Sequence, residues 1–84
     1  MTPLNRSAIM ESLIIADPEI LGGKPIIRGT RISVDFILEL YAAGVSREEI
    51  LADYPHLTPE AISACLSFAA HAIKNEIYLE LKAA

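Results

Sequence analysis

Residues 22–34 constrain the fold more than any other stretch of the chain. Two short β-branched runs, 26–28 and 31–32, lie on either side of a Gly-Thr pair that begins at Gly29. A two-residue loop with glycine first predicts a β-hairpin with a type II′ turn, because glycine readily adopts the positive φ that this turn needs. A two-stranded hairpin is marginal in water. The pattern therefore calls for a third strand, either 13–16 or one from a second copy of the chain.

The same hairpin would gather positive charge. In it Arg28 and Arg31 would lie opposite each other beside the turn and point to one face, where like charges repel. With Lys24 close by, this face predicts a binding site for an anion. An alternative carries equal weight: a carboxylate inside the fold neutralises the pair, the candidates being Asp17, Glu19 and Asp35.

Helix-capping residues divide the rest of the chain into three helices. A hydroxyl side chain stands before each of them, at Ser33, Ser46 and Thr58. The expected helices are 34–43, 47–53 and 59 to about 81. Gly44 is expected to end the first in a left-handed conformation. The sequence thus predicts an α+β, mainly α fold: a three-helix, helix-turn-helix (homeodomain-like) bundle with a small N-terminal β element.

The chain is expected to form one domain between two terminal segments. Residues 1–12 form an N-terminal arm that is expected to fray, residues 13–73 form the domain, and residues 74–84 form a projecting end of the last helix. That helix is apolar nearly all round up to residue 73, which predicts burial on more than one side. Its projecting end is expected to bind a partner through Ile77, Tyr78 and Leu81.

Composition favours association with other protein chains over a general affinity for nucleic acid. The 84 residues are 52% hydrophobic, more than a small monomer readily hides, so we expect a homodimer, a higher homo-oligomer or a protein partner. The net charge of −4 argues against a basic face of the kind that nucleic-acid-binding domains carry. DNA binding would therefore need a local basic cluster.

The helix-turn-helix outline, formed by helices 47–53 and 59–70, lacks the side chains that read bases. Recognition helices use Arg, Lys, Asn or Gln, and none of these occurs between Thr58 and Ile73. The exposed start of the last helix offers Thr58, Ser63 and Ser67 as polar contacts beside Glu60, which would repel phosphate. Contacts to DNA phosphates would have to come from Lys24, Arg28, Arg31 and Arg47.

Several other classes of protein are disfavoured. One cysteine, Cys65, permits no internal disulfide and is typical of a reducing cytoplasm. No run of about 18 apolar residues and no signal peptide is evident, so no membrane association is expected. His56 and His71 have no ligand partners at metal-binding spacing. We therefore expect no metal, no cofactor, no catalytic residue and no enzymatic activity.

The stretch 17–32, Asp-Pro-Glu-Ile-Leu-Gly-Gly-Lys-Pro-Ile-Ile-Arg-Gly-Thr-Arg-Ile, followed by Gly-Val-Ser at 44–46 and Asp-Tyr-Pro-His-Leu-Thr at 53–58, closely resembles the bacterial family called domain of unknown function 433. The resemblance covers roughly residues 13–73. The family is described as homeodomain-like, and its members are regarded as antitoxins of type II toxin–antitoxin pairs, encoded beside a small PIN-like nuclease. The resemblance implies an antitoxin that binds a PIN-like toxin and regulates its own transcription at operator DNA. The residues themselves leave two alternatives, a dimeric scaffold or protein-interaction module without DNA binding, and a sensor of a small anion.

Overall fold

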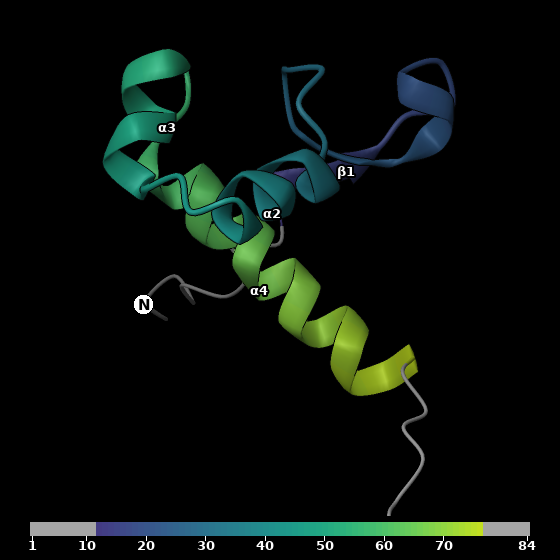
Figure 1. Cartoon of the computed structure of the whole chain (residues 1–84). Helices are drawn as coiled ribbons and strands as arrows, with labels where there is room; N and C mark the ends of the chain where they lie inside the picture. Colours follow the sequence, from purple (N-terminus) through teal and green to yellow (C-terminus); the bar gives the residue numbers. More distant parts are fainter. Residues whose placement is uncertain (1–11, 77–84) are drawn as a thin grey trace, which may run out of the picture.

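The computed structural model describes residues 12–76 of the chain. Its elements are β1 (Ile14–Ala16), the 3-10 helix η1 (Leu21–Gly23), β2 (Pro25–Ile27), α2 (Val34–Ala42), α3 (Arg47–Asp53) and α4 (Pro59–Glu76). Both α2 and β1 pack against α4, and β2 packs against α2; α4 runs diagonally through the molecule (Figure 1). The fold is mainly α with a small antiparallel sheet near the N-terminus, as predicted.

The expected strand 26–28 forms one residue earlier, as β2, and it pairs with the other expected strand, 13–16, rather than with 31–32. β1 and β2 run antiparallel, with Ile14 opposite Ile27 and Ala16 opposite Pro25. The predicted hairpin partner at 31–32 forms no strand. It is replaced by one isolated bridge from Ile26 to Ser33. The reason is local: Ser33 must turn the chain into α2, so the extended segment is too short to form a ladder.

The predicted type II′ turn and the opposed arginines are wrong. The Thr30 amide donates to the Ile27 carbonyl at 3.0 Å, so Arg28 and Gly29 are the central residues of the turn. Gly29, with φ of 79°, stands in the second central position, where a type II turn requires positive φ. The Thr30 hydroxyl holds this turn by donating to the same carbonyl at 2.8 Å. Arg28 therefore lies inside the turn and Arg31 beyond it, and they form no cross-strand pair.

The capping residues act as the sequence predicts. The Phe36 amide donates to the Ser33 hydroxyl at 3.2 Å, and the Glu49 amide donates to the Ser46 hydroxyl at 3.1 Å. Gly44, with φ of 87°, follows α2 in the left-handed conformation. α2 ends one residue earlier than predicted, and α3 has the predicted bounds. The expected extension of the last helix to residue 81 lies outside the described residues.

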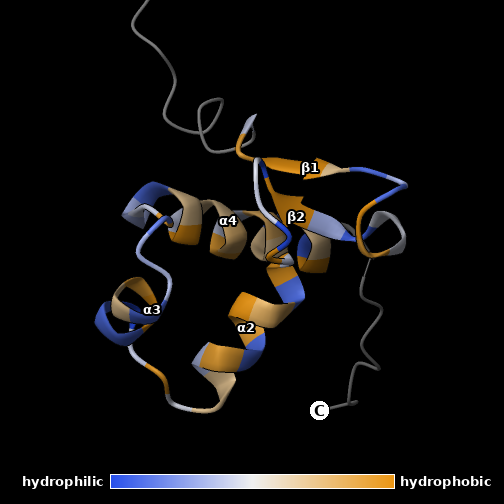
Figure 2. Ribbon diagram, turned by 90° about the horizontal axis from the view of Figure 1, so that it is seen from above, coloured by the Kyte–Doolittle hydropathy of each residue, from blue (hydrophilic) through white to orange (hydrophobic). Residues whose placement is uncertain are grey.

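The core lies where α2, α3 and the first half of α4 meet beneath the sheet. Ile37, Ile50 and Ile62, one from each helix, are at most 1% exposed and belong to one buried cluster. Figure 2 shows the hydrophobic residues of α2, α4 and the strands in orange and the hydrophilic residues of α3 in blue. The second half of α4 differs, because Ile73 is 56% exposed. One helix thus has a buried half and an open half.

Candidate functional site

Three of the four basic side chains expected to contact DNA make interactions within the protein. Lys24 Nζ lies 3.3 Å from a carboxylate oxygen of Asp35 in an exposed ion pair. The Arg28 Nε–H donates to the Ser12 carbonyl at 2.8 Å and ties the turn to the start of β1. An Arg47 Nη2–H donates to the Pro59 carbonyl at 3.1 Å and joins the first turns of α3 and α4. The structure gives each of these side chains a bracing role.

Arg31 is the exception. It is exposed, and no other residue within 12–76 forms a hydrogen bond or ion pair with its side chain. The predicted neutralisation by Asp17, Glu19 or Asp35 is not observed for this guanidinium, since Asp35 pairs with Lys24 and the Asp17 carboxylate accepts from the Glu19 amide at 2.9 Å. Arg31 is therefore available to an external anion.

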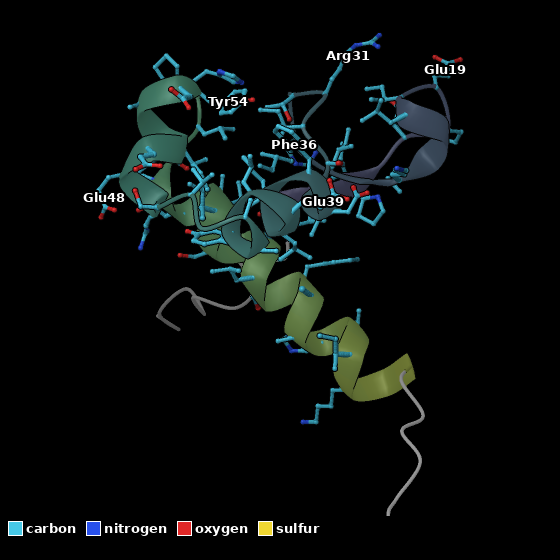
Figure 3. The ribbon with its side chains drawn as sticks, viewed as in Figure 1. Glu19, Arg31, Phe36, Glu39, Glu48 and Tyr54 are labelled. Carbon is cyan, nitrogen blue, oxygen red and sulfur yellow. The ribbon has the colours of Figure 1, made fainter. Side chains whose placement is uncertain are left out.

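Arg31 borders a hollow of about 350 Å³ between η1, α2 and the end of α3. Its other walls come from Leu21, Ile32, Ser33, Phe36 and Tyr54. Figure 3 shows Tyr54 and Arg31 on opposite sides of this region with Phe36 between them. The rings of Phe36 and Tyr54 meet edge to face, with centroids 5.8 Å apart. The hollow thus combines an aromatic wall with one unpaired cation.

The two polar candidates on α4 have little to offer DNA. Thr58 Oγ1 accepts a hydrogen bond of 3.1 Å from the Ala61 amide and so caps the helix. Ser63 is half-buried between the buried Ile62 and Ala64. The capping role is sufficient to explain the hydroxyl at position 58.

Replacing Thr58 by alanine is expected to lower the free energy of unfolding by about 1 kcal/mol, because the Ala61 amide loses its acceptor. Thr58→Ser keeps the acceptor and is expected to stay close to the wild type. Urea unfolding followed by circular dichroism measures both changes. An unchanged stability of Thr58→Ala would show that the cap contributes nothing.

The exposed side of α3 and the start of α4 is acidic. Residues 47–60 contain four carboxylates and a single cation, Arg47. The carboxylates are all exposed, and none forms an ion pair within residues 12–76; they are Glu48, Glu49, Asp53 and Glu60. Figure 3 shows Glu48 pointing away from α3 into solvent. We call these four residues the acidic face. In a DNA-binding helix-turn-helix this region approaches phosphates and is basic.

An apolar groove of about 400 Å³ lies beside the second half of α4. Leu38 of α2 and Pro25 of β2 form one side, and Phe68, Ala69, Ala72 and Ile73 of α4 form the other. The Lys24–Asp35 ion pair stands at its edge. A hydrogen bond from Ser33, followed by the charge of Lys24, holds the pKa of Asp35 below its ordinary value. The groove therefore carries one cation and one anion at neutral pH.

Sequence reasoning located some of these features and missed others. The apolar character of the last helix predicted burial on more than one side, and an open apolar groove lies beside its second half. The hollow beside Arg31 was missed, because Tyr54 and Leu21 are distant in sequence and meet only through the fold. No sequence signal identified Arg47 as a brace. The predicted partner contacts Ile77, Tyr78 and Leu81 lie outside the described residues and stay predictions.

Cys65 sits in the core and is 0% exposed. Burial raises the pKa of its thiol from 9.0 to about 11. The thiolate is the reactive form, so alkylation of the folded chain by iodoacetamide at pH 8 is expected to be about a hundredfold slower than that of the unfolded chain. Mass spectrometry of the alkylated protein over time measures this difference.

The same pKa shift has a consequence for stability. Between the two pKa values the unfolded chain releases the thiol proton while the folded chain keeps it, so stability falls as the pH rises above 9. As the pH rises from 8 to 10, the free energy of unfolding is expected to fall less in Cys65→Ala than in the wild type. Equal losses in the two proteins would show that the thiol does not titrate differently on unfolding.

No group of three His, Cys, Asp or Glu side chains within residues 12–76 is placed to hold a metal ion. In the same part of the chain, no helix has the length and apolarity needed to cross a membrane. This part of the chain instead presents exposed charged side chains, among them the acidic face and Arg31.

Known proteins resemble this chain in both sequence and fold. A crystal structure of a DUF433 member from Anabaena variabilis ATCC 29413 matches with a TM-score of 0.72 and 31% identity, over 80% of this chain and 66% of that one. An uncharacterized protein of Sinorhizobium fredii, y4eO, is 36% identical over 66 residues, which are 79% of this chain and 30% of that protein. The chain thus spans less than a third of y4eO and just under two thirds of the Anabaena protein. The family model described as protein of unknown function (DUF433) matches residues 14–69, most of the described domain, and this chain belongs to that family.

Proposed function

We propose that this chain is the antitoxin of a type II toxin–antitoxin pair and that it binds a PIN-like nuclease toxin. The observation that carries the proposal is the acidic face of α3 and α4, whose four exposed carboxylates have no ion-pair partner within residues 12–76. A nuclease binds nucleic acid through positive charge. A rigid acidic surface is complementary to such a groove and competes with the nucleic acid for it.

The geometry suits this role because the acidic face is well anchored. The bond from Arg47 to the Pro59 carbonyl holds α3 against the start of α4, and Ile50 fixes α3 in the core at 0% exposure. Because the backbone that carries these charges is already ordered, binding costs the conformational entropy of the side chains alone. The charges also speed association with an oppositely charged partner. The predicted contacts at Ile77, Tyr78 and Leu81 would add an apolar contact area to this electrostatic attraction.

The proposal is tested by co-expression with the protein encoded by the adjacent gene. We expect the two proteins to co-purify, the complex to dissociate more readily as the salt concentration rises, and the nuclease activity of the neighbour to fall on addition of this chain. Purified proteins that neither associate nor affect each other at low salt would overturn the proposal.

A second candidate function, binding of operator DNA and autoregulation of transcription, is favoured by two exposed arginines: Arg28 lies in the turn, and Arg31, just beyond it, has no partner within residues 12–76. In gel-shift assays on the chain's own promoter, replacement of Arg28 and Arg31 by alanine is expected to remove binding and its salt dependence. Lys74→Ala, which removes an exposed cation on the second half of α4, is the control. Equal binding by all variants would show that these arginines do not contact the DNA. No binding by the wild type would leave the chain a protein-interaction module without DNA binding.

A further inference from the structure

The face of α4 that packs in the core continues beyond the part that the domain covers. Ala61 and Cys65 on this face are buried. At successive spacings of three and four residues the face continues with Phe68 and Ala72. Phe68 is 40% exposed. Figure 1 shows the second half of α4 leaving the other elements. An apolar helix face that extends beyond the elements packed on it indicates that another surface packs there.

The shape of this surface is suited to a copy of itself. The apolar groove supplies a hollow of about 400 Å³ between α2, β2 and α4. Phe68 and Ile73 stand on its α4 side and are 40% and 56% exposed. A two-fold interface brings the same patch of both subunits together, so each patch must offer both protrusions and hollows. This groove offers both.

The charges at the groove also favour a second copy of this chain as its binding partner. Lys24 and Asp35 lie 3.3 Å apart with 58% and 53% of their side chains exposed, so the surface is electrically neutral. The chain as a whole carries −4. Two copies that met through their acidic faces would repel each other, whereas two copies that meet at the groove add no like-charge contact. A two-fold axis also lets Lys24 of each copy approach Asp35 of the other.

From these observations we infer that a second copy of this chain covers the groove, in a two-fold dimer that packs the second halves of two α4 helices together. The dimer buries Phe68 and Ile73 of both copies. It leaves both acidic faces open, so the inference stands apart from the proposed antitoxin role and survives its failure. Each dimer would present two identical acidic faces to partners.

The test uses the full chain and measures its mass in solution by light scattering across a range of concentrations. Ile73→Glu places a carboxylate in the interface and is expected to raise the dimer dissociation constant about a hundredfold or more, because a buried charge without a partner is costly. Leu66→Glu is the matched control, since Leu66 is an apolar α4 residue of similar exposure, 44%, that does not line the groove. We expect Leu66→Glu to remain dimeric. Circular dichroism verifies that both variants fold.

A charge exchange provides a second readout that does not depend on apolar packing. Lys24→Glu makes the groove edge negative, and Asp35→Lys makes it positive. Each variant alone is expected to dimerise more weakly than the wild type, and their mixture is expected to form a heterodimer of wild-type affinity.

Three results would overturn the inference. The wild type stays monomeric up to its solubility limit, or Ile73→Glu remains as dimeric as Leu66→Glu, or the mixed charge variants fail to associate. In the first case, dimerisation only after removal of residues 2–11 would assign the groove to the chain's own N-terminal segment. A monomer whose groove variants lose the toxin would assign it to that partner instead, and so belongs to the first case.

Discussion

Replacing Ile37 by alanine is expected to lower the free energy of unfolding by about 2–5 kcal/mol. Ile37 is 0% exposed and lies on α2 in the cluster that also contains Ile50 and Ile62. The substitution removes three carbon atoms at the point where the helices meet, and the rigid surroundings leave a cavity. A domain of this size has a total stability of roughly 5–15 kcal/mol. The variant is therefore expected to be close to unfolding at 37 °C.

Equilibrium unfolding in urea, followed by circular dichroism, measures this loss. Leu66→Ala is the control, because it removes the same number of carbon atoms from a side chain that is 44% exposed. We expect the control to lose less than about 1 kcal/mol. A loss of similar size in the two variants would show that the cluster around Ile37 is not the centre of the core.

The helical part of this fold could be predicted because its determinants are local. A capping hydroxyl bonds an amide three residues away, so Ser33, Ser46 and Thr58 mark helix starts from sequence alone. The left-handed exit at Gly44 is equally local. Periodicity then identifies the buried side of each helix. These signals predicted the three α-helices that the structure describes within residues 12–76 and the residues at which they start.

The sheet was harder to predict because two local requirements competed. The residues around Gly29 favour a hairpin, but the cap at Ser33 needs the chain to enter α2 immediately. In the structure the helix cap at Ser33 forms, and β2 pairs with β1 across an intervening loop. Strand pairing over such a distance depends on tertiary packing rather than on turn residues. The sequence therefore suggested β1 as a strand without fixing its partner.

The candidate site was less predictable than the sheet, because only the fold shows which charged side chains lie on one surface. The sequence showed the carboxylates of residues 47–60, but only the fold shows that Glu48, Glu49 and Asp53 are all exposed while Ile50 among them is buried. Likewise, nothing local separates Arg47, which donates to the Pro59 carbonyl, from Arg31, which has no partner within residues 12–76. Long side chains reach partners that sequence spacing does not reveal.

That acidic face gives the second large effect, on binding of the proposed toxin. Replacing Glu48 and Asp53 by lysine is expected to weaken the complex about a hundredfold or more, because each change turns an attraction into a like-charge contact. The double variant should also lose the salt dependence of binding, which comes from these charges. Isothermal titration calorimetry at low and high salt measures both effects.

The matched control replaces Glu19 and Glu39 by lysine. Both side chains are exposed and lie outside α3 and α4, and the pair changes the net charge by the same amount as the test variant (Figure 3). If the whole-chain charge governs binding, the two double variants weaken the complex equally. If the acidic face governs it, only Glu48→Lys with Asp53→Lys does so. Full retention of binding by that variant would place the toxin on another surface and remove the observation on which the antitoxin proposal depends.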